Sequence, residues 1–107
     1  MNNLYAYIAG LIDGEGCVNT YQIKNGRGVA YPTPIIVFVQ AEGNKGEEIC
    51  HLLKDTFGGH ISSKQPKNPK YQKIWRHEVR GSFARKMATL ISPYSIIKKS
   101  KLLSIAG

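Results

Sequence analysis

Acidic residues are few in this sequence and nearly absent from its second half. The 107 residues include 7 Asp and Glu against 15 Lys and Arg, which gives a net charge of +8 and a pI of about 9.7. Residues 1–59 have a net charge of −2, whereas residues 60–107 have a net charge of +10 with Glu78 as their one carboxylate. Because so large a charge repels itself, we expect a polyanionic partner that binds the second half of the chain.

Long apolar runs and cysteine motifs are also missing. No stretch of roughly 18 apolar residues occurs, so we expect no membrane span, and the N-terminus lacks the basic segment of a secretory signal peptide. Cys17 and Cys50 have neither CxxC spacing nor a familiar zinc pattern with the 3 histidines. We therefore expect an intracellular protein with reduced thiols, in the cytoplasm or nucleoid, or in an organelle matrix if an organelle encodes it.

Hydrophobic residues make up 42% of the chain, enough to form the core of one domain over residues 1–107. Apolar residues at helical spacing predict helices over 3–13, 46–57, 83–91 and about 95–105, with Ser82 capping the third. Alternating residues predict strands over 17–24, 29–40, 60–64 and 71–80. The order α-ββ-α-ββ-α(α) predicts an α+β fold with a four-stranded antiparallel sheet.

Two details of the strands follow from single residues. Pro32 and Pro34 cannot donate a ladder hydrogen bond, so we expect the second strand to begin in earnest at Ile35. In the fourth strand, alternation puts Trp75, His77 and Val79 on one face.

The most informative segment is residues 8–16, which read IAGLIDGEG. Gly14 and Gly16 are expected to end the first helix. Asp13 and Glu15 both lie at its C-terminal end, where the helix dipole already presents negative charge. Two carboxylates there favour a hard cation such as Mg²⁺, with a solvated helix end as the alternative.

This segment resembles the LAGLIDADG motif of the homing endonucleases. Ile8 replaces the first leucine, Glu15 stands where the family has Asp or Glu, and the other positions match at Ala9, Gly10, Leu11, Ile12, Asp13, Gly14 and Gly16. The resemblance implies a site-specific endonuclease that cuts double-stranded DNA as a homodimer at a palindromic or pseudo-palindromic target. It also implies two or three Mg²⁺ ions shared across the dimer, with Glu15 and the Gly14 carbonyl as ligands and Asp13 capping the helix end.

The same resemblance assigns an interface and further site residues. The homodimer would form through the 3–13 helix, with the partner helix packed on the small residues Ala6, Ala9 and Gly10. Arg80 matches the family's basic residue at the end of the fourth strand, and Gln40 is our choice for the polar residue of the second strand, for which Glu42 and Asn44 compete. Lys98 joins these catalytic candidates and, with Lys99 and Lys101, is expected to contact backbone phosphate.

Side chains of the sheet would read the DNA bases in the major groove. The candidates are polar or basic residues of the two hairpins: Thr20, Gln22, Lys24, Arg27, Lys64, Lys73 and Arg76. The alternative function is a catalytically silent DNA-binding regulator or an RNA-splicing maturase with the same fold, for which intron RNA would be a partner. An interaction module with a coincidental motif is a further alternative. The chain ends soon after its lysine cluster, whereas many family members continue, so we expect a strong dependence on the dimer interface.

Overall fold

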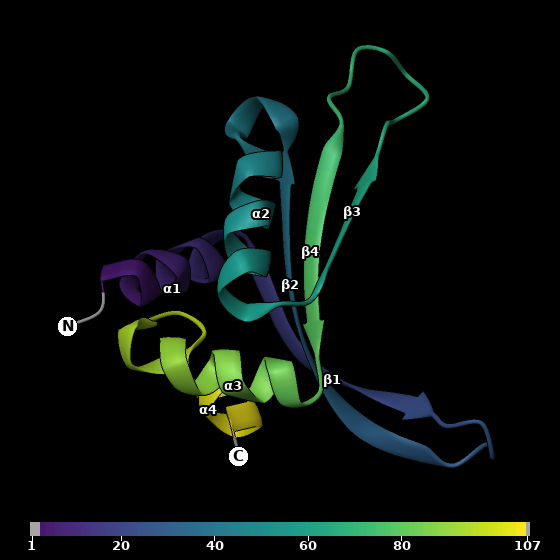
Figure 1. Ribbon diagram of the computed structural model, residues 1–107, viewed down its shortest axis with the longest axis vertical. Coiled ribbons are helices and arrows are strands. Elements are labelled where there is room, and N and C mark those ends of the chain that lie inside the picture. The colour runs from purple at the N-terminus through teal and green to yellow at the C-terminus, as the bar shows by residue number, and fades with distance from the viewer. Residues whose placement is uncertain (1–2, 107) are drawn as a thin grey trace.

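Four strands form an antiparallel sheet in the order β1-β2-β4-β3. The structure is a computed structural model and describes residues 3–106. The strands are β1 (Gly16–Lys24), β2 (Ala30–Ala41), β3 (His60–Lys64) and β4 (Ile74–Arg80). They form two hairpins, β1–β2 and β3–β4, whose tips lie at opposite ends of the molecule (Figure 1).

The helices pack on one face of this sheet. They are α1 (Asn3–Glu15), α2 (Gly46–Phe57), α3 (Ser82–Ile91) and α4 (Lys99–Ala106), with short 3₁₀ turns at Glu42–Asn44 and Ser92–Tyr94. The predicted α+β class and antiparallel sheet are confirmed, and the predicted bounds of α2 and β3 are the observed ones. Within residues 3–106, none of the helices has the length and apolar character needed to cross a membrane.

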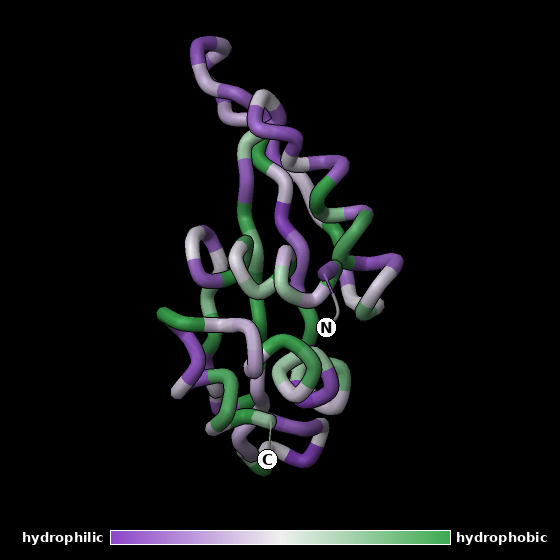
Figure 2. Tube along the Cα trace, turned by 90° about the vertical axis from the view of Figure 1, so that its left-hand side faces the viewer, coloured by the Kyte–Doolittle hydropathy of each residue, from purple (hydrophilic) through white to green (hydrophobic). Residues whose placement is uncertain are grey.

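Alternation along the strands separates a covered face from an open face. The covered face carries the side chains that the helices bury almost completely: Val18, Ile36, Phe38, His77 and Val79. They pack against apolar residues of α1, α2 and α3, among them Ile8, Leu53 and Met87. Figure 2 shows hydrophobic segments along the sheet and hydrophilic ones in the β3–β4 loop at its top.

The residues of opposite parity form the open face. On β1 they are Cys17, Asn19, Tyr21 and Ile23, on β2 Thr33, Ile35, Val37 and Val39, on β4 Ile74, Arg76, Glu78 and Arg80, and on β3 His60, Ser62 and Lys64. The prediction that Trp75, His77 and Val79 share one face is confirmed. His77 and Val79 are buried with the core, and Trp75 packs against it.

The second strand begins earlier than we predicted. Pro32 pairs with Gln22 and Pro34 with Thr20, so β2 is continuous from Ala30. The Pro34 carbonyl accepts a hydrogen bond from Gly81 N–H, which shows that the backbone of Pro34 faces the β4 side. β4 pairs with β2 only from Ile35 onward, so the missing proline N–H groups lie at an unpaired edge and cost no ladder bond.

Several other element ends differ from prediction: α1 extends through Gly14 to Glu15, and α4 begins at Lys99 rather than near residue 95. β4 begins at Ile74 rather than at residue 71, because Gln72 and Lys73 bond instead to the backbone of the 3₁₀ turn at 42–44. Ser82 does not cap α3: the N-cap is Gly81, which has a φ of 60°, and no side chain caps the helix. Glycine adopts that angle without steric cost and so permits the sharp turn from β4 into α3.

Candidate active site and nucleic-acid interface

Asp13 joins the end of α1 to the segment before α4. Its carboxylate accepts hydrogen bonds from the backbone N–H groups of Ile96 (2.8 Å), Lys98 (3.1 Å) and Ile97 (3.3 Å), and from the Ser95 hydroxyl. Burial alone would raise the pKa of Asp13, but these hydrogen bonds outweigh it and hold the pKa below its ordinary value. Both oxygens are therefore engaged with residues 95–98 rather than with the end of α1 itself, so Asp13 holds this segment against the helix.

Glu15 has a different environment. It is exposed at the last position of α1, and its side chain makes no hydrogen bond or ion pair with any of residues 3–106. The carboxylate and the neighbouring Gly14 carbonyl are hard oxygen donors of the kind that Mg²⁺ and Ca²⁺ prefer. No group of three or more His, Cys, Asp or Glu side chains that could hold a metal ion occurs in the described part of the chain. The donor chemistry fits such a cation, but a full ligand set needs oxygens from outside this chain.

Lys98 lies beside this helix end. Its Nζ donates a hydrogen bond to the Asp13 carbonyl at 3.0 Å, while its backbone N–H bonds the Asp13 carboxylate. An ammonium group on the last carbonyls of a helix is favourable because it offsets the negative end of the dipole. Lys98 therefore contacts the end of α1 that also carries Gly14 and Glu15, and its catalytic role stays a prediction.

The exposed side of α1 carries two glycines among larger side chains. Gly10 and Gly14 are exposed there, and a Cβ added to either would meet nothing within 4 Å. Leu4 is 39% exposed and Tyr7 52% exposed on the same helix. Ala9 does not belong to this surface: it is fully buried in the core, because α1 turns Ile8, Ala9 and Ile12 toward the sheet. Of the predicted small stripe, Gly10 is exposed, Ala6 is half-buried and Ala9 is a core residue.

Two arginines of β4 share one carboxylate on the open face. Glu78 accepts a hydrogen bond from Arg76 Nη2 at 2.6 Å and another from Arg80 Nε. Burial by itself would raise the pKa of Glu78, but the hydrogen bonds and charges of both arginines hold it below the ordinary value. The carboxylate is therefore ionised at neutral pH and orients both guanidinium groups.

The other two catalytic candidates lie on β4 and β2. Arg80 pairs with Ile35, which in turn pairs with Asn19, so Arg80 is two strands away from β1, about 10 Å across the sheet. Gln40 has the parity of the buried Phe38, and its amide oxygen accepts a hydrogen bond from the Ala41 N–H at 3.0 Å. Gln40 lies two residues beyond Phe38, which pairs with Gly16 directly after α1, and a catalytic role for Arg80 and for Gln40 stays a prediction.

The predicted DNA contacts divide between two faces. Lys64 and Arg76 lie on the open face, whereas Thr20, Gln22 and Lys24 have the parity of the buried Val18 and lie on the opposite side of the sheet. The remaining candidates lie elsewhere: Arg27 is in the β1–β2 turn, Lys73 stacks its ammonium 4.8 Å from the Trp75 ring, and Lys99 and Lys101 are exposed on α4. One surface therefore does not hold all the predicted base-reading residues.

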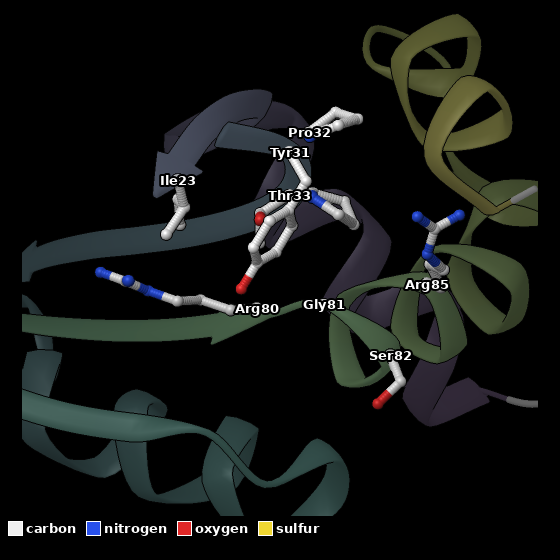
Figure 3. A pocket seen from close by; sticks show the side chains of 9 residues that line it. Ile23, Tyr31, Pro32, Thr33, Arg80, Gly81, Ser82 and Arg85 are labelled. Carbon is white, nitrogen blue, oxygen red and sulfur yellow. The ribbon is translucent and has the colours of Figure 1, made fainter. Parts of the chain in front are cut away.

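A pocket of about 550 Å³ lies where β2 and β4 meet α3, and Arg80 and Arg85 both line it. In Figure 3 the Arg80 side chain runs back along its own strand, and Arg85 points away on the opposite side. The two cations do not converge on one ligand position. The pocket is a gap between the β1–β2 hairpin and α3 rather than a formed anion site.

Three features of the candidate site and of the open face were not predicted from the sequence. Ser95 and its neighbours hold Asp13 from 82 residues away in the chain, a contact that no local pattern signals. Glu78 joins two arginines, and its isolation as the single carboxylate of the basic half was the available signal. Tyr21 belongs to the open face, which the core residue Val18 of opposite parity could have indicated.

Several solved structures of homing endonucleases have this arrangement. I-CvuI in complex with its target matches with a TM-score of 0.72 and 15% identity, over 92% of this chain and 60% of that one. The archaeal intron-encoded I-Vdi141I complexed with DNA matches with a TM-score of 0.66 and 20% identity, over 94% and 63%. The group I intron-encoded I-CeuI complexed with DNA matches with a TM-score of 0.68 and 15% identity, over 99% and 53%.

The chain thus spans less than two thirds of the length of each of these three proteins. No protein-family model and no curated protein sequence matches it. The structural matches cover nearly all of the chain and share its antiparallel sheet with helices on one face. The chain has the fold of the LAGLIDADG homing endonucleases.

Proposed function

We propose that this protein is a site-specific DNA endonuclease that acts as a homodimer with divalent cations. The observation that supports this proposal best is the different environment of the two acids of one motif. Both carboxylate oxygens of Asp13 accept hydrogen bonds from residues 95–98. Glu15, two residues later, is exposed, and its side chain makes no hydrogen bond or ion pair within residues 3–106. Asp13 thus contributes to the fold, whereas the carboxylate of Glu15 is available to a cation.

The cation would be held by the Glu15 carboxylate and the Gly14 carbonyl, with the remaining ligands from DNA phosphate and a second chain. When bound there, a divalent cation lowers the pKa of a coordinated water and stabilises the leaving oxygen. The chain itself contributes position and charge. Residues 95–98 fix the helix end through Asp13, and the Lys98 ammonium lies at the Asp13 carbonyl, where it offsets the negative charge that a phosphate brings.

Two copies are needed because each chain supplies one Glu15. Gly10 and Gly14 carry no side chain on the exposed side of α1, so a second helix can approach closely at these two positions. A twofold pair of chains would present two equal sites, one for each DNA strand, and would bind a palindromic or nearly palindromic target.

The test begins with selection of bound sites from a randomised double-stranded DNA library in Ca²⁺, followed by Mg²⁺ and sequencing of the cut ends. We expect defined cuts within a palindromic consensus. Glu15→Gln should abolish cutting and leave binding largely intact, whereas Glu48→Gln, at an exposed acid of α2, should cut normally. A consensus that the native protein binds but never cuts would contradict the nuclease and favour a regulator or a maturase, for which intron RNA is the next ligand to test.

A further inference from the structure

The open face has an apolar floor at its centre. Along β2 its side chains are Ile35, Val37 and Val39, none of which can form a hydrogen bond. Two hollows lie on this floor. The first, of about 320 Å³, is floored by Ile23, Ile35 and Val37 with Tyr21 at its edge. The second, of about 360 Å³, is floored by Val39 and Ile74. Either is large enough to admit the edge of a base.

Cationic side chains surround both hollows. Arg76 lines the two of them and so separates one from the other, while Arg80 lines the first and Lys64 the second. This arrangement favours a polyanion over an apolar protein surface, because a hydrophobic partner would have to strip water from three cations.

The negative charge of Glu78 determines which part of the polyanion can lie over the hollows. Its side chain is 15% exposed on the wall of the first hollow and holds Arg76 and Arg80 by hydrogen bonds. An ionised carboxylate at this position repels phosphate, but it is compatible with the neutral base edges of a groove. Phosphates would then lie at the rim and base edges over the floor.

The apolar group that projects from the base edges into the major groove is the C5-methyl of thymine. Resting on the proposed function, we propose that the two hollows of the open face bind thymine methyl groups in each half of the DNA target. Ile35 and Val37 contact the methyl group in the first hollow, and Val39 and Ile74 contact it in the second. Arg76, between them, is placed to reach the base edge that separates the two contacts.

Replacement of single thymines by deoxyuridine tests this, since it removes the methyl group and keeps base pairing and the hydrogen-bonding edge. The probe is the duplex selected as above, held uncut in Ca²⁺, with each consensus thymine replaced in turn. We expect at least one thymine in each half-site at which the change weakens binding about fourfold, the loss expected for one buried methyl group. If every deoxyuridine duplex binds within twofold of the parent, or the consensus has no thymine, the inference is wrong while the DNA-binding proposal stands.

Variants of the protein place the contact. Val37→Thr and Val39→Thr keep the β-branched shape but put a hydroxyl into the first or second hollow. Each should bring the binding ratio of thymine to deoxyuridine duplex close to one at its own position and leave the other position unchanged. Val29→Thr, at an exposed valine in the β1–β2 turn outside both hollows, should preserve both ratios. Because the ratio is measured within each variant, a general loss of folding or affinity cancels.

Two outcomes remain. Ratios that stay at their native value in both threonine variants would refute the assignment to these hollows. A library from which no duplex is enriched would refute the proposed function, and this inference with it.

Discussion

Gly10 offers a test in which the effects on the single chain and on the dimer have opposite signs. In the chain alone, a Cβ at this position meets nothing within 4 Å, and the residue lies in the middle of α1. Gly10→Ala should therefore stabilise the isolated chain by about 1 kcal/mol, the difference in helix propensity between glycine and alanine. A stabilising change at a motif residue is expected only if the glycine serves something other than the fold of one chain.

In the dimer the same position would be in contact with the partner helix. Side chains inserted into a close-packed contact cost about 1–3 kcal/mol each, and a twofold interface contains the substitution twice. Gly10→Leu should then weaken dimerisation by about 2–6 kcal/mol, which raises the dimer dissociation constant at least about 30-fold. Gly10→Ala should weaken it in the same direction but less.

Sedimentation equilibrium measures the dissociation constant, and urea denaturation at concentrations below it measures the stability of the chain. Gly26→Ala is the matched control, because its Cβ is equally unobstructed but it lies in the β1–β2 turn. It should leave dimerisation unchanged. A native protein that stays monomeric, or a Gly10→Leu variant that dimerises like the native one, would refute the helix pair.

Three further predictions concern titration and the β4 arginine. Asp13→Asn should lower the free energy of unfolding by about 2 kcal/mol or more. The lowered pKa of Asp13 stabilises the native fold at pH values above the unfolded pKa of about 3.9. The variant should therefore lose less stability than the native protein as the pH falls below that value. Burial lowers the pKa of His77 despite the 2.7 Å contact of its ring with the Gly58 carbonyl. The free energy of unfolding should therefore fall as the pH drops below about 6.5. In denaturant titrations, His77→Gln should make the free energy of unfolding less dependent on pH in this range. Arg80→Ala should slow cleavage more than it weakens binding, and equal losses in both assays would make Arg80 a DNA contact only.

The parts of the fold that sequence could predict are those fixed by local patterns. The apolar spacing in α2 and the glycines Gly58 and Gly59 after it gave the bounds of that helix. The motif at the end of α1 could be recognised from the sequence because its glycines and acids are adjacent in the chain. The predicted start of β2 was wrong because we assumed that Pro32 and Pro34 would face partner strands on both sides. In the structure this segment pairs with β1 alone, so the missing N–H groups cost no hydrogen bond.

The face of β1 needed information that the strand alone does not contain. Its alternation is almost balanced, with Thr20 and Gln22 on one side and Asn19 and Tyr21 on the other. A rule that puts polar residues outward therefore selects the wrong side for Thr20, and only the complete burial of Val18 under the helices decides the parity. The same limit applies to Arg76 and Arg80, whose shared partner Glu78 depends on strand geometry rather than on charge count.

The two acids of the motif show why local sequence predicts a site more readily than it assigns roles within it. Asp13 and Glu15 are separated by one glycine, and the helix dipole disfavours both equally. Their roles differ because Asp13 points toward residues 95–98, which supply three backbone N–H donors, while Glu15 lies one step further, where α1 gives way to β1. Loss of Asp13 should therefore be measured as lost stability, and loss of Glu15 as lost cleavage in a protein of native stability. If Glu15→Gln also lowers stability by as much as Asp13→Asn, this division of roles is refuted.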